Sequence, residues 1–180
     1  MFKINLRQLT SAAMLTALSI ILERFITITP ASNTLDIRIT FANVPIILAG
    51  LLVSPLMGGI CGVVSDIVGC FISGYPPFPI LTLAPLVTGF LPGFIVLSLQ
   101  NFNIKKHKVA FNLTVLLFAV GLSHLLSSFF ITTLGLSIMR GIDFEPMFIT
   151  RLPSMLIGLF IDAVSVCLLY APLKHAIKKL

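Results

Sequence analysis

Two arginines stand inside apolar stretches of the chain, where a charged side chain is expensive. Arg24 follows Glu23 near the end of the first apolar segment, and Arg151 lies a few residues into the last one. A charge at the centre of a membrane helix costs about 2.5–3.5 kcal/mol, so it commonly has a partner or lines a wet cavity. The planar guanidinium suits carboxylates. We predict that both arginines converge on an anionic ligand; alternatively, Glu23, Asp66 or Asp162 pairs with each of them and the arginines are structural.

Three uncharged polar residues lie at a depth similar to that of the arginines. Asn43 begins the second apolar segment, Thr82 lies near the start of the fourth, and Ser137 follows the fifth. Amide and hydroxyl groups both donate and accept hydrogen bonds. We expect these three side chains to bind polar atoms of the same ligand.

Three other polar residues in apolar segments are predicted to be structural. Asp66 lies in the third segment, Asp162 in the sixth, and His124 in the fifth, between two serines. Buried polar groups are normally hydrogen-bonded, and a bond to a neighbouring helix explains each of them. We interpret His124 as a hydrogen-bonded packing residue rather than a proton relay.

A stiff aromatic loop connects the third and fourth segments. It reads Tyr75-Pro76-Pro77-Phe78-Pro79, and proline restricts both its own backbone and that of the preceding residue. Two interpretations remain open. The loop either packs as a rigid turn on the helix ends, or it forms, with residues 30–38, a lid that stacks on a flat ligand and slows its release.

The sequence carries no recognisable catalytic or nucleotide-binding motif. It has no P-loop, no H-E-x-x-H zinc motif, and no paired carboxylates at one depth. Cys61, Cys70 and Cys167 lie in apolar stretches without the spacing of metal ligands. We therefore expect no enzyme, no metal and no cofactor. If the protein moves a solute uphill, the energy must come from a gradient or another subunit.

The elements that position these residues are predicted to be membrane-spanning helices. The chain has 180 residues, of which 57% are hydrophobic and 10% charged, too few charges to cover a soluble domain. A spanning helix needs about 20 apolar residues, and lipid admits only structures that satisfy their own backbone. The sequence predicts one all-α membrane domain over residues 1–180, a six-helix bundle with segments at 9–29, 41–53, 56–72, 80–99, 109–134 and 147–173.

The basic residues predict the orientation of this bundle. With six spans, eight of them fall on one side, whereas Arg38 and Arg140 fall on the other. Loops rich in Lys and Arg stay cytoplasmic, so both termini are expected in the cytoplasm. The net charge of +6 then reflects topology and contact with anionic lipid, not nucleic acid. The eight are Lys3, Arg7, Lys105, Lys106, Lys108, Lys174, Lys178 and Lys179.

Small residues share one face of the first segment. Ala13 and Ala17 are four positions apart, a spacing that lets another helix backbone approach closely. The pattern indicates close helix packing, either within the chain or with a partner protein.

A series of short motifs extends over nearly the whole chain: AMLTA at 13–17, LERF at 22–25, RITFANVPI at 38–46, AGLLVSP at 49–55, GVVSDIVG at 62–69, TTLGLSI at 132–138 and TRL at 150–152. The series resembles the substrate-binding S components of energy-coupling factor (ECF) vitamin transporters, most closely the folate-specific group. It departs from that group's N-T-L-W-L-S at Thr132 and Gly135, and from its P-G-F-T at residues 80–81.

The resemblance implies a six-helix bundle in a bacterial cytoplasmic membrane, with an outward-facing pocket closed by extracellular loops. It implies a T component in the membrane and two ATPases as partners, and folate or a reduced folate as the ligand. Ala13 and Ala17 would then meet the T component. Aromatic side chains would stack on the ligand's rings, and arginines would bind its carboxylates. The expected substrate-binding residues are Arg24, Arg38, Phe41, Asn43, Tyr75, Phe78, Thr82, Ser137 and Arg151.

Two other functions remain open on the sequence. The chain could be an S component for another anionic vitamin, such as pantothenate, which would use the arginines without needing an aromatic lid. It could also be a membrane scaffold or enzyme subunit whose polar groups only hold helices together. Ligand-dependent thermal stabilisation separates these alternatives, because a ligand that binds only the folded protein stabilises it.

Overall fold

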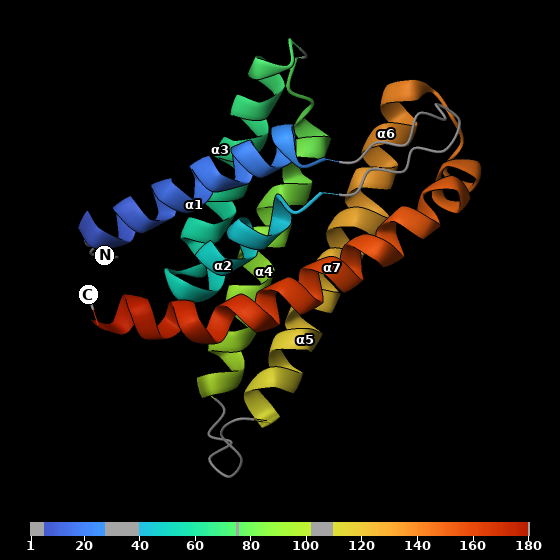
Figure 1. Ribbon diagram of the computed structural model, residues 1–180. Helices are drawn as coiled ribbons and strands as arrows, with labels where there is room; N and C mark the ends of the chain where they lie inside the picture. The colour runs from blue at the N-terminus through green and yellow to red at the C-terminus, as the bar shows by residue number, and fades with distance from the viewer. Residues whose placement is uncertain (1–5, 28–39, 75, 102–109, 180) are drawn as a thin grey trace.

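The computed structural model describes residues 6–27, 40–74, 76–101 and 110–179, and these residues form helices and short turns without strands (Figure 1). Because α5, η1 and α6 follow one another without a break, the elements make six helical rods, as the sequence predicts. The elements are α1 (Leu6–Phe25), α2 (Asn43–Leu52), α3 (Pro55–Ile72), α4 (Pro79–Asn101), α5 (Ala110–His124), the π-helix η1 (Leu125–Thr132), α6 (Thr133–Arg140) and α7 (Phe144–Lys179).

Within the described residues, four helical stretches are long and apolar enough to cross a membrane: Pro55–Ile72, Pro79–Leu99, Leu113–Arg140 and Phe144–Tyr170. The protein is therefore a multi-pass membrane protein. α1 has 20 residues, but it carries three charges and is not among these four stretches. α2 has ten residues and is about 15 Å long, half of the ~30 Å hydrocarbon core. The fifth predicted segment extends past residue 134 to Arg140, because η1 passes directly into α6.

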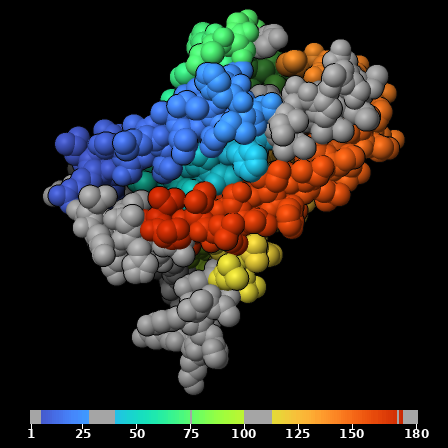
Figure 2. All heavy atoms as spheres, in the orientation of Figure 1, coloured from blue at the N-terminus to red at the C-terminus, as the bar shows by residue number. Residues whose placement is uncertain are grey.

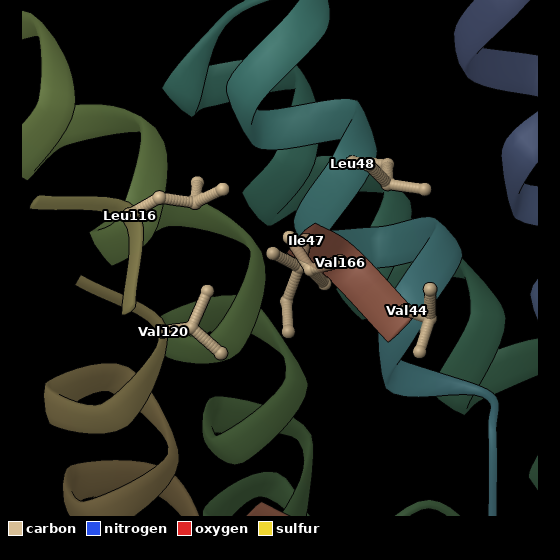
Figure 3. Close-up of a cluster of buried hydrophobic side chains, with 6 residues drawn as sticks. All are labelled: Val44, Ile47, Leu48, Leu116, Val120 and Val166. Atoms are coloured by element: carbon tan, nitrogen blue, oxygen red, sulfur yellow. The ribbon is translucent and has the colours of Figure 1, made fainter. Parts of the chain in front are cut away.

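The short helix α2 lies at the centre of the bundle. In Figure 2 it is visible between α1 and α7, which cross the same face of the molecule. It packs against α1, α3, α4 and α7, and every residue from Val44 to Gly50 is buried. Its apolar side chains form a core with those of α5 and α7 (Figure 3); the cluster comprises Val44, Ile47, Leu48, Leu116, Val120 and Val166.

Helices α2, α3 and α4 meet backbone to backbone at five glycines, the glycine junction. A methyl group added at Gly50 would overlap the carbonyl oxygen of Gly89, and one at Gly58 would lie 2.5 Å from the Cα of Gly50. Lipid provides no hydrophobic force between helices, so close van der Waals contact between small residues holds them together. The junction comprises Gly50, Gly58, Gly62, Gly89 and Gly93.

A capped turn directs α3 back along α2. The Ser54 side chain accepts a hydrogen bond from the backbone N–H of Met57 at 3.2 Å, and Pro55 occupies the first turn of α3. Serine is a preferred N-cap, and proline at the first helical position has no N–H that needs a partner. The turn brings Gly58 against Gly50, so the residues of this turn help to place two of the glycines that form the junction.

We expect Gly89→Ala to destabilise the protein, because the added methyl group would meet the backbone of Gly58 and lie 2.8 Å from Ile46 Cγ2. Overpacking of this kind costs about 1–3 kcal/mol, and thermal unfolding in detergent measures it. Gly121→Ala is the matched control, since a methyl group there meets nothing within 4 Å and alanine favours a helix. Equal melting temperatures for the two variants would contradict the role assigned to the junction.

Candidate functional site

A cavity of about 310 Å³ lies within the bundle, and every helical rod contributes to its wall. This volume falls at the lower end of the range of small-molecule sites, about 300–1,000 Å³. No Phe or Tyr side chain of the described residues lines it. The lining residues are Ser19, Glu23, Thr40, Ala42, Asn43, Ile46, Ser65, Asp66, Leu81, Ala84, Pro85, Thr88, His124, Ser127, Ser128, Thr132, Leu136, Arg140, Arg151, Ser154, Met155 and Gly158.

Charges of opposite sign occupy different walls of the cavity. Glu23 of α1 and Asp66 of α3 line it from one pair of contacting helices, and Arg140 of α6 and Arg151 of α7 from another. Carboxylates accept hydrogen bonds, whereas guanidinium groups donate them. The cavity therefore suits a ligand that has N–H donors in one part and an anionic group in another.

Four hydroxyl groups of the wall can only accept hydrogen bonds from a ligand, because each already donates its hydrogen to a backbone carbonyl. Ser19 donates to the carbonyl oxygen of Ala42 at 2.8 Å. Ser65, Thr88 and Ser154 each donate to a carbonyl three or four residues earlier in their own helix, at 2.8–2.9 Å. A hydroxyl has one hydrogen and two lone pairs, so these groups retain only lone pairs for a ligand.

Asp66 is held in place by Thr82, whose hydroxyl donates to Asp66 Oδ2 at 2.7 Å. Asp66 lines the cavity and Thr82 does not, so the structure places the predicted ligand-binding threonine behind an aspartate that the sequence analysis assigned to structure. An aspartate in a spanning helix is itself the signal that points to such a site.

Another carboxylate, Asp162, is fully buried and joins three helices. Asn43 Nδ2 donates to Asp162 Oδ2 at 3.0 Å, and His124 Nδ1 lies 3.0 Å from the same oxygen. The side chains of His124 and Asp162 are 3% and 0% exposed. The structure thus shows the hydrogen bonds that the sequence analysis expects for Asp162 and His124. It also places Asn43 and His124 in the cavity wall, a position that the sequence analysis missed for His124.

Arg24 points away from the cavity. Its guanidinium contacts the hydroxyl of Ser73 and the carbonyl of Gly69, at the end of α3 where unpaired carbonyls attract a cation. Its neighbour Glu23 lines the cavity instead. Successive residues of a helix point about 100° apart, so the expected convergence of Arg24 with Arg151 is not seen.

Arg151 lines the cavity, and Arg140 lines it as well. Arg151 Nη1 donates to the hydroxyl of Thr133 at 3.2 Å, and Thr133 is fully buried. The guanidinium is thereby held against the end of η1. Sequence analysis assigned Arg140 to a loop, because it did not extend the fifth segment through α6.

The other predicted binding residues lie outside the cavity wall. Phe41 and Phe78 are half-buried and do not line it. Ser137 donates to the carbonyl of Ile142 at 2.6 Å, which fastens the turn between α6 and α7. Arg38 and Tyr75 lie outside the described residues.

Helix α1 carries small residues on two faces. Ala12 and Thr16 are buried, and the carbonyl of Ala12 lies 3.5 Å from the thiol sulfur of Cys61 on α3. Ala13 and Ala17 are exposed. The inward face packs within the chain, and the outward face leaves Ala13 and Ala17 open.

Comparisons with known proteins agree with this architecture. The chain is 30% identical over 143 residues to "Folate transporter FolT" of Clostridium novyi (strain NT), covering 78% of this chain and 74% of that protein. It matches a solved structure described as "Crystal structure of FolT bound with folic acid" with a TM-score of 0.72 and 23% identity, over 94% of this chain and 98% of the other. That likeness establishes the fold.

The family described as "ECF transporter, substrate-specific component" matches residues 7–170. The match includes α1 through most of α7 and every residue of the cavity wall. The chain therefore belongs to the substrate-specific components of the ECF transporters.

Proposed function

We propose that the protein is the folate-binding subunit of an ECF-type importer, which captures folate or a reduced folate outside the cell. The observation that carries this proposal is the pairing of an acidic and a basic wall in one cavity, Glu23 and Asp66 against Arg140 and Arg151. Folate has the same polarity, with an N–H-rich pterin at one end and glutamate carboxylates at the other. The relative from Clostridium novyi is named a folate transporter.

In this arrangement Asp66 binds the pterin. The 2-amino group and N3–H of a pterin form two parallel donors, which match the two oxygens of a carboxylate. Thr82 fixes one of these oxygens from behind. Arg140 and Arg151 bind the glutamate carboxylates, with Arg151 oriented by its bond to Thr133.

The chain works with a membrane T component and two ATPases in this proposal, because it belongs to a family of substrate-specific components. The exposed Ala13 and Ala17 of α1 form the contact with the T component, where small residues permit close helix approach. Both termini are cytoplasmic, in line with the distribution of Lys and Arg. The first turn of α1 and the last turn of α7 also lie on one side of the molecule (Figure 1). Substrate then enters from the outside.

We expect Asp66→Asn to weaken folate binding by roughly tenfold to a hundredfold. The amide keeps one acceptor for Thr82 but faces the ligand's N–H donors with its own, and a lost charge-assisted bond costs ~1–3 kcal/mol, at ~1.4 kcal/mol per decade of affinity. Calorimetry with purified protein measures the loss. Asp143→Asn, the same change at an exposed position outside the cavity wall, should leave affinity unchanged; equal effects would exclude Asp66 as a ligand.

Arg24 and Arg151 should respond differently to truncation. Arg151→Ala removes a donor to the ligand, so folate affinity should fall about tenfold to a hundredfold in a folded protein. Arg151→Lys should restore it only in part, because lysine lacks the planar fork. Arg24→Ala breaks the bonds to α3 and should lower the melting temperature while affinity stays near that of the wild type. If Arg24→Ala loses affinity and Arg151→Ala does not, the site is misassigned.

Replacing Ala13 or Ala17 by Trp should abolish folate uptake and complex assembly in cells. Binding by the isolated subunit should persist, since both side chains are exposed and lie outside the cavity wall. Thermal stabilisation by folate, with pantothenate as the comparison ligand, reports binding; uptake of labelled folate reports coupling. Loss of ligand-induced stabilisation in these variants would show that the alanines support the bundle itself.

A further inference from the structure

One nitrogen of the cavity wall has no hydrogen-bond partner. His124 Nε2 is buried and pairs with no atom of the described residues, although His124 is only 3% exposed and lines the cavity. On the facing helix, a methyl group added at Gly158 would lie 3.3 Å from His124 Cε1 and 3.4 Å from Nε2. A glycine there leaves the edge of the imidazole uncovered.

The bonds of Asp162 decide which hydrogen-bonding role this nitrogen has. Asp162 Oδ2 accepts from Asn43 Nδ2 and faces His124 Nδ1, each at 3.0 Å. A carboxylate only accepts, so a ring proton sits on Nδ1, and in the neutral tautomer that carries its proton there Nε2 presents a lone pair. An acceptor buried without a partner lowers stability. The geometry therefore calls for a ligand atom that donates a hydrogen bond to His124.

Two neighbouring side chains also favour a ligand that donates hydrogen bonds. Thr88 and Ser154 also line the cavity, and each donates its hydroxyl hydrogen to a backbone carbonyl at 2.8–2.9 Å. Both therefore offer lone pairs, as His124 does. A ligand edge that consists of acceptors finds no hydroxyl or ring donor at these three side chains, whereas an edge with N–H groups finds several acceptors.

Resting on the folate-binding function proposed above, we infer that His124 is a specificity-determining residue that selects reduced pterins. If Asp66 takes the 2-amino and N3–H edge, the ring nitrogens left for His124 include N5 and N8, the two that gain a hydrogen when the pterin is reduced. In folic acid both are aromatic acceptors, and their lone pairs face that of Nε2. In tetrahydrofolate both carry a hydrogen, and in 5-formyltetrahydrofolate N8 does. Asp162 is the positioning residue that holds the imidazole in the accepting form.

Affinities of the wild-type protein for these three compounds test the inference directly. Calorimetry under anaerobic conditions should show tetrahydrofolate and 5-formyltetrahydrofolate binding about tenfold or more tightly than folic acid, because one bond is gained and one repulsion removed. Folic acid binding as tightly as both reduced forms would overturn the role of His124 and leave the folate function intact. If none of the three binds, the proposed function fails as well.

A pair of variants assigns the preference to His124. His124→Phe keeps a planar ring without an acceptor, so the ratio of affinities should fall to about one. His124→Gln can place an oxygen near the position of Nε2 and should keep part of the preference. The ratio is measured within one sample, so a partly unfolded preparation does not alter it. If the ratio of affinities in His124→Phe stays at its wild-type value, the inference is overturned. If neither variant folds, the affinities of the wild-type protein for the three compounds test the inference.

Discussion

The close backbone contact of α2, α3 and α4 at the glycine junction is the constraint on which the rest of the structure depends. A side chain at Gly50, Gly58 or Gly89 would separate these helices. Because they can touch, a ten-residue helix that cannot span a bilayer still reaches the middle of the bundle, where α1 and α7 pack on it. Its first residue, Asn43, then lies at the cavity.

The ionisable groups within the bundle divide into two kinds by what surrounds them. Arg24 donates to a backbone carbonyl at the end of α3, and Asp162 is fully buried in contact with Asn43 and His124. Asp66 and Arg151 each bond to a threonine and also line the cavity. A charge in lipid has a partner or lines a wet cavity, and these two side chains do both.

Helix α1 connects the cavity with the outer surface of the bundle. Ser19 and Glu23 contribute to the cavity wall, Ala12 and Thr16 pack inside, and another face carries the exposed Ala13 and Ala17. One helix thus presents both the ligand side and the side proposed to meet the T component.

The sequence alone predicted an all-α membrane fold, the approximate bounds of its six rods and the short second helix. Of the binding residues it proposed, Asn43 and Arg151 lie in the cavity wall. Only the tertiary structure decided that Glu23 rather than Arg24 faces the cavity, that Arg140 joins Arg151, and that Asp66 and His124 belong to the wall. The physical reason is that hydropathy reports how deep a residue lies along the membrane normal. Its direction around the helix axis changes by about 100° per residue and depends on which helices pack beside it.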